Sequence, residues 1–105
     1  MPDYQMTDVI ADRTYDFKGR DGVAEVIKVQ IGKPAPTADT PTPAWYCPWL
    51  VVRGGKRRKL AASGEDSLQA LLLALSGLRT DLQLAAEQGK LSYEGIDGPS
   101  IDLVG

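Results

Sequence analysis

The segment between Ser63 and Gly89 constrains the fold of this chain more than any other, because it is rich in leucine and alanine and has helix-boundary residues at both ends. Ser63 followed three residues later by Asp66 has the spacing of a capping box, and Gly89 is a typical helix terminator. One long amphipathic helix is therefore predicted. At about 100° per residue, a leucine stripe roughly 120° wide is expected to bury on a sheet. The stripe consists of Leu68, Leu71, Leu72, Leu75, Leu78 and Leu82.

Two pairs of segments with alternating apolar residues predict the strands of that sheet. Residues 9–17 and 23–31 alternate with a period of two and are joined by a glycine-containing turn, which is typical of a β-hairpin. Residues 45–52 and 56–62 form a second such pair around a double-glycine turn. Pro48 has no N–H to donate, so the third strand is expected at a sheet edge, or with a bulge or a bend.

The remaining segments complete a predicted α+β domain. Residues 32–43 are rich in proline and threonine, which predicts a mobile loop. Residues 91–105 form a tail that is expected to dock in part as a short late strand. The predicted fold is a single domain over residues 1–105, in which an antiparallel sheet of four or five strands packs on one long helix.

The sequence gives no indication of a membrane or secreted protein. No apolar run approaches the ~20 residues that span a bilayer, and the N-terminal residues lack a basic segment followed by an apolar one. We therefore expect a cytoplasmic protein that does not associate with membranes.

The residue types that most enzymes and metal sites use are scarce. The chain has no histidine and a single cysteine, Cys47, which removes the usual zinc ligands and the commonest general base. We therefore predict no cofactor, no metal site and no enzymatic activity. Cys47 lies between Trp45 and Trp49, where a buried packing role is the favoured interpretation. The alternative is a reactive thiol at Cys47, as the nucleophile of a thiol-dependent enzyme or as a haem ligand.

Positive charge is concentrated in the second predicted hairpin. Five of the twelve basic residues lie there, so the rest of the chain holds 7 basic against 14 acidic residues. The cluster is a candidate contact for anions or nucleic acid, with Trp45, Tyr46 or Trp49 as a stacking surface. The favoured interpretation is a solvated edge hairpin, because the acidic remainder repels a polyanion. The cluster consists of Arg53, Lys56, Arg57, Arg58 and Lys59.

The helix face opposite the leucine stripe is small and apolar where a solvated helix would carry charged residues. Gly77 alone costs a helix about 1 kcal/mol relative to alanine, which suggests that another backbone approaches closely. The face is therefore a candidate surface for a protein partner or a homodimer. Burial under the C-terminal tail is the competing interpretation. The face consists of Ala70, Leu73, Ala74, Gly77 and Leu84.

Two motifs resemble a family of small bacterial proteins of unknown function. The first is the strand pattern W-x-C-P-W at residues 45–49, and the second is the helix pattern D-S-L-Q-A-L-L-L-A-L-x-G-L-R at residues 66–79. The resemblance extends from the first hairpin to the end of the helix. It implies a compact stand-alone bacterial domain, and it brings no catalytic residues and no ligand.

Taken together, these features predict a non-enzymatic protein-interaction module of bacterial cytoplasm, of an inhibitor or immunity type. The alternative is an accessory protein that binds nucleic acid through the basic residues of the hairpin at 53–59. A thiol-dependent enzyme centred on Cys47 is the third hypothesis.

Overall fold

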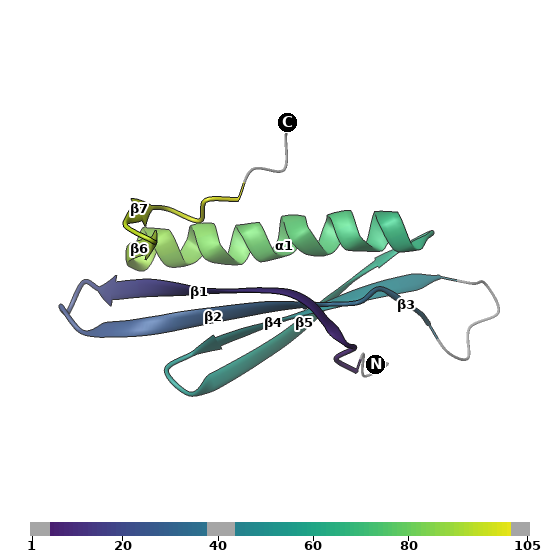
Figure 1. Ribbon diagram of the computed structural model, residues 1–105, viewed down its shortest axis with the longest axis horizontal. Helices are drawn as coiled ribbons and strands as arrows, with labels where there is room; N and C mark the ends of the chain where they lie inside the picture. The colour runs from purple at the N-terminus through teal and green to yellow at the C-terminus, as the bar shows by residue number, and fades with distance from the viewer. Residues whose placement is uncertain (1–4, 38–43, 102–105) are drawn as a thin grey trace.

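One long helix, α1 (Ser67–Gln88), lies along one face of an antiparallel sheet in the computed structural model (Figure 1). The structure describes residues 5–37 and 44–101. The predicted α+β class is confirmed, although the sheet has seven strands because β3 and β7, of two residues each, extend it. In chain order the strands are β1 (Val9–Gly19), β2 (Ala24–Gly32), β3 (Ala35–Pro36), β4 (Trp45–Arg53), β5 (Lys56–Gly64), β6 (Gly89–Tyr93) and β7 (Ile96–Asp97).

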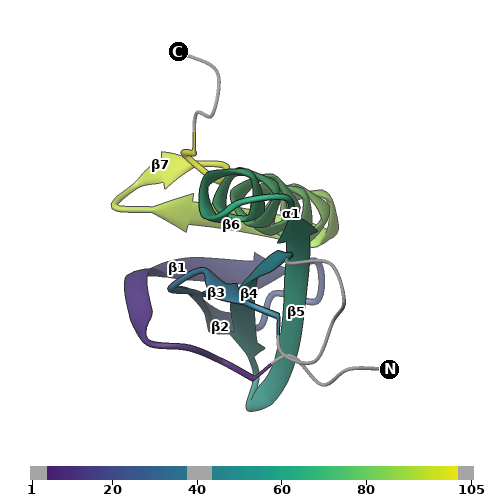
Figure 2. The ribbon, with the colours of Figure 1, turned by 90° about the vertical axis from the view of Figure 1, so that its right-hand side faces the viewer.

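The sheet is built outward from its two long hairpins. Neighbouring strands follow the order β5, β4, β2, β1, β6 and β7, and β3 pairs with β4 beyond the end of β2. The helix connects β5 on one side of the sheet to β6 on the other, so it crosses the inner face between them (Figure 2). The two-residue turn between β4 and β5 has positive φ at Gly54 and Gly55, as a primed turn requires.

Pro48 does not lie in an edge strand, but the expected departure from a regular central position is found. Strand β4 has neighbours on both sides, yet on one side β2 pairs with residues 49–53 and β3 with residues 45–46. Pro48 therefore falls at the break between β2 and β3, where neither strand requires a donor. A proline is tolerated inside this sheet because its missing N–H coincides with the gap.

The helix begins later than the sequence predicted. Ser63 and Gly64 complete β5, and the N-cap is Asp66, whose side chain accepts a hydrogen bond of 2.7 Å from the backbone N–H of Gln69. Gly89 ends the helix as expected, with an extended backbone that starts β6 directly. A side chain at Gly89 would collide with the Lys18 carbonyl oxygen, because β6 begins pairing with β1 at this residue.

The buried face of the helix differs from the predicted leucine stripe. Leu78 and Leu82 are in the core, but Leu68 and Leu72 are 62% and 53% exposed. Leu71 and Leu75 are half-buried at the margin of the core. The residues that face the sheet instead are mostly small, and the face is turned by roughly 80° from the predicted one. The buried helix residues are Ala70, Ala74, Leu78, Leu82 and Ala85.

Large side chains of the sheet explain this rotation. A methyl group added at Gly77 would lie 2.6 Å from Cη2 of Trp49, so the helix is close to the sheet where its residues are small. The leucine count favoured one face, whereas close packing against bulky strand residues selects the other. The sheet contributes Tyr15, Phe17, Ile27, Val29, Ile31, Cys47, Trp49 and Leu91 to the core.

The candidate partner surface on the helix is therefore not a single exposed face. Ala70 and Ala74 are fully buried, and Gly77 contacts Trp49. Trp49 of β4 covers the helix at Gly77, and residues 102–105 of the tail, which was the competing cover, lie outside the described residues. Leu73 and Leu84 are 43% and 49% exposed, and they alone remain available to a partner from the predicted set.

The tail docks as predicted over its described part. After β7, the Tyr15 hydroxyl donates a hydrogen bond of 2.5 Å to the Pro99 carbonyl, and Arg13 Nη1 donates one of 2.9 Å to the Ser100 carbonyl. The Arg13 guanidinium also lies 4.3 Å from the centroid of the Tyr93 ring. Within the predicted loop at 32–43, β3 forms an unpredicted strand, and residues 38–43, with their predicted mobility, lie outside the described residues.

Candidate functional site

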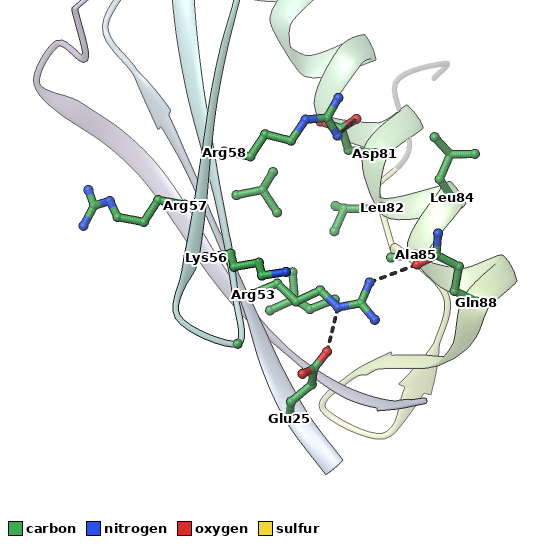
Figure 3. Close-up of a pocket in the computed structure, with 13 residues that line it drawn as sticks. Glu25, Arg53, Lys56, Arg57, Arg58, Asp81, Leu82, Leu84, Ala85 and Gln88 are labelled. Carbon is green, nitrogen blue, oxygen red and sulfur yellow. Dashed lines mark hydrogen bonds and ion pairs between the residues drawn. The ribbon is translucent and has the colours of Figure 1, made fainter. Parts of the chain in front are cut away.

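A cleft of about 780 Å³ separates the β4–β5 hairpin from the C-terminal half of α1 (Figure 3). Its volume falls within the range of ligand pockets in proteins. Buried apolar residues form its base, and polar side chains from β2, β4, β5 and α1 surround them. The apolar lining consists of Ile27, Val51, Leu82, Leu84 and Ala85. The polar lining includes Glu25, Arg53, Lys56, Arg58, Asp81 and Gln88.

Strand alternation divides the predicted basic cluster between two faces of the sheet. Arg53, Lys56 and Arg58 are on the inner face and line the cleft. Arg57 borders the cleft, but its side chain points away from it (Figure 3). Alternation also places Lys59 on the outer face, opposite Leu50 of β4. The structure thus brings together three of the five residues predicted to contact anions.

Arg53 is fixed at one end of the cleft. Its Nε lies 2.6 Å from Oε1 of Glu25, and its Nη1 donates a hydrogen bond of 3.0 Å to Oε1 of Gln88. Its guanidinium also lies 4.4 Å from the centroid of the Phe17 ring. Arg53 therefore bridges sheet and helix with its charge already compensated, and it serves as a wall of the cleft.

Arg58 closes the other end of the cleft loosely. Its Nη1 lies 3.5 Å from Oδ1 of Asp81, and its side chain is 66% exposed. The other carboxylate oxygen of Asp81 accepts a hydrogen bond of 3.0 Å from Trp49 Nε1. An exposed pair at this distance contributes between 0 and about 1 kcal/mol, so Arg58 can exchange Asp81 for another carboxylate at little cost.

The charges that face the cleft do not cancel. The side chains of Arg53, Lys56 and Arg58 meet two carboxylates, those of Glu25 and Asp81, which leaves one positive charge. Lys56 is exposed and forms no ion pair within the described part of the chain. This arrangement suits a ligand that joins a carboxylate to an apolar group, because cations surround an apolar base.

The tryptophans and the cysteine face the core instead of the cleft. Trp49 is 6% exposed and Trp45 is half-buried, so Trp49 cannot stack on a nucleic-acid base in this conformation. The prediction that Cys47 is buried is confirmed. Its thiol lies 3.3 Å from the Gly32 carbonyl oxygen, to which it donates a hydrogen bond, and burial raises its pKa. A higher pKa disfavours the thiolate that nucleophilic or haem-ligand chemistry requires.

The described residues contain neither a cluster of metal-binding side chains nor a membrane-spanning helix. Across 5–37 and 44–101, no three side chains of the metal-binding types gather closely enough to hold an ion. In the same ranges, no helix combines the length and the apolar composition needed to cross a bilayer.

Sequence reasoning missed the three polar residues that hold the arginines in place. Glu25 and Gln88 position Arg53, and Asp81 contacts both Trp49 and Arg58. A signal for Asp81 exists in the sequence: it follows Gly77 by four residues and precedes Ala85 by four, so it interrupts a stripe of small residues. No comparable pattern marks Glu25 or Gln88.

Comparison with known proteins connects this structure to a family. A family model described as a domain of unknown function, DUF6968, matches residues 11–101. No curated protein and no solved structure matches the chain. The matched range includes the helix and every strand residue that lines the cleft. The resemblance to a family of unknown function is therefore confirmed, and the chain belongs to the DUF6968 family.

Proposed function

We propose that this chain is a non-enzymatic protein-interaction module of bacterial cytoplasm, of an inhibitor or immunity type, and that its cleft contacts the partner. The observation that carries the proposal is the composition of the cleft and its rim. Arginine side chains stand beside an apolar base, and the exposed Leu84 borders both. Arginine next to exposed apolar side chains is the composition of energetically dominant patches in protein interfaces.

The chemistry of the described residues supports a binding role. Cys47 is the only cysteine, and its burial and raised pKa favour a packing role over a nucleophilic one. The chain has no histidine to act as a general base. Arg53 is held across the gap between sheet and helix by Glu25 and Gln88, whereas Lys56 and Arg58 remain available to meet a partner.

The alternative of nucleic-acid binding receives less support from the geometry. The basic residues of the hairpin point to both faces of the sheet, and Trp49 is directed into the core. Binders of single strands combine a continuous basic groove with exposed aromatic side chains. Protein binding through the cleft requires only the inner half of the cluster.

Arg57 and Arg58 are adjacent in β5 but face opposite sides of the sheet, so substituting each in turn tests whether the cleft binds the partner. A display library of short linear peptides is selected on the wild-type protein and on the Arg58→Ser and Arg57→Ser variants. We expect peptides that bind the wild type and Arg57→Ser but bind Arg58→Ser at least about tenfold more weakly. Equal binding to both variants, or binding only of single-stranded oligonucleotides, would overturn the proposal.

A second copy of this chain is the other protein partner to test. Light scattering over a range of concentrations, on the wild type and on Leu84→Lys, measures whether a dimer forms through the rim of the cleft. Dimerisation lost in Leu84→Lys identifies the partner as a second copy. A monomer at all concentrations excludes a second copy as the partner.

A further inference from the structure

We infer that β5 is a docking edge, to which an extended acidic segment of the partner protein adds as a further strand and directs a carboxylate into the cleft. The inference rests on the proposed protein-binding function and names the chemistry of the partner. Strand addition of this kind gains affinity from main-chain hydrogen bonds and specificity from alternate side chains.

The first observation concerns the strand pairing of β5. That strand pairs with β4, and no other strand in the described ranges pairs with it. The two-residue turn makes Arg53 and Lys56 the hydrogen-bonded closing pair of the hairpin. Alternation along the ladder then directs the N–H and C=O groups of Arg57 and Ala61 away from β4, where an added strand can bind them.

The second observation is the charge of this edge. Residues 56–59 are four consecutive cations, and charged residues on an edge strand disfavour pairing with a like strand. A second β5 would bring lysine and arginine opposite lysine and arginine. An acidic strand meets the same edge with opposite charges, so the edge rejects its own copy and accepts an acidic segment.

The third observation is that Lys56 and Arg58, on the inward face of β5, line the cleft. Side chains of an added strand that point inward would enter beside Lys56 and Arg58. Arg58 is only loosely held by Asp81, at 3.5 Å, and the cleft retains one positive charge. A single inward glutamate or aspartate satisfies that charge, and it gives Arg58 a closer partner.

The fourth observation is an apolar flank on the helix. The helix runs antiparallel to β5, because Asp81 neighbours Arg58 whereas Ala70 neighbours Gly64 at the far end of the strand. Leu84 lines the cleft, and helical spacing places Leu73 on the same flank, toward the far end. The partner segment therefore carries its acidic residue near Arg58 and an aliphatic inward residue near Leu73.

The test uses defined peptides and fluorescence anisotropy. A short blocked peptide alternates threonine, facing outward, with two inward glutamates followed by an inward leucine. We expect it to bind the wild-type protein, with at least about tenfold loss when glutamine replaces glutamate or when Arg58 is changed to Ser. The Arg57→Ser variant should lose less than about twofold, because its side chain points away from the cleft. Thermal melts establish that both variants are folded.

A matched peptide separates strand addition from simple charge attraction. N-methylation of alternate amides removes the main-chain donors that face β5 and leaves every charge in place. Loss of binding supports strand addition, whereas unchanged binding overturns it. Binding of a single-stranded oligonucleotide without binding of the acidic peptide also overturns the inference. If library selection instead yields uncharged peptides that depend on Arg58, the proposed function stands and the acidic-strand inference fails.

Discussion

Trp49 Nε1 donates a hydrogen bond of 3.0 Å to Oδ2 of Asp81, and this contact joins the core to the candidate site. The ring of Trp49 lies against the helix at Gly77, one turn before Asp81. The second oxygen of Asp81 faces Arg58 in the cleft. The packing of β4 on the helix therefore determines where one end of the cleft closes.

The contact between Gly77 and Trp49 predicts that Gly77→Ala destabilises the protein. Alanine would normally stabilise a helix by about 1 kcal/mol over glycine. Here the added methyl would lie 2.6 Å from the indole ring, and overpacking of this kind costs about 1 to 3 kcal/mol. Urea unfolding should show a net loss, while the exposed Ser76→Ala control changes stability by less than about 0.5 kcal/mol. Increased stability of Gly77→Ala would contradict the close approach.

The rotated helix face predicts different costs for two leucines of the original stripe. Leu78→Ala removes a side chain that is 5% exposed and should cost about 2 to 5 kcal/mol. Leu72→Ala removes one that is 53% exposed and should cost less than about 1 kcal/mol. The free energies of unfolding from urea melts measure both. Similar costs at the two positions would restore the face predicted from the leucine pattern.

Two substitutions at Asp81 separate its structural contact from its charge. Asp81→Asn keeps an oxygen for Trp49 and removes the carboxylate that competes for Arg58, so the affinity for the acidic peptide should rise about two- to fivefold. Asp81→Leu leaves the indole N–H without its acceptor and should cost about 1 to 3 kcal/mol of stability. Anisotropy titrations and thermal melts measure these effects. Weaker peptide binding to Asp81→Asn would show that Asp81 helps to form the binding surface.

The raised pKa of Cys47 predicts a loss of stability at alkaline pH. The unfolded chain releases the thiol proton near pH ~8.5, whereas the buried thiol holds it to higher pH. Its contribution to stability is therefore complete below that pH and declines as the pH rises above it. Under reducing conditions, the stability difference between wild type and Cys47→Ala should shrink from about pH 7 to about pH 10. A constant difference would indicate an accessible thiol.

Local sequence patterns were sufficient for the fold class and for the long elements, but not for the two-residue strand β3. Both hairpins, the long helix and the late strand were predicted from alternation, turn glycines and leucine content, because these signals act over a few residues. The helix cap moved from Ser63 to Asp66 because β5 continues through Gly64, and strand pairing with β4 outweighed the capping pattern.

The face of the helix and the geometry of the cleft depend on contacts between distant parts of the chain. Counting leucines could not reveal that Trp49 requires a glycine opposite its ring. The basic cluster was visible, but its division between two faces follows from the strand register that the turn sets at Arg53 and Lys56. Glu25 and Gln88 meet Arg53 from 28 and 35 residues away, a relationship that no local pattern encodes.

The inward face of α1 carries mostly small residues, whereas the strands supply the large aromatic side chains of the core. This division also affects how the protein unfolds. Alanine and glycine on the inward helix face provide little apolar area for the helix to stabilise itself, and the aromatic rings of the sheet belong to the same core cluster as the buried helix residues. If α1 separated from the sheet, neither the helix nor the sheet would keep the apolar contacts that stabilise it. Circular dichroism and tryptophan fluorescence should therefore report one cooperative transition with coincident midpoints.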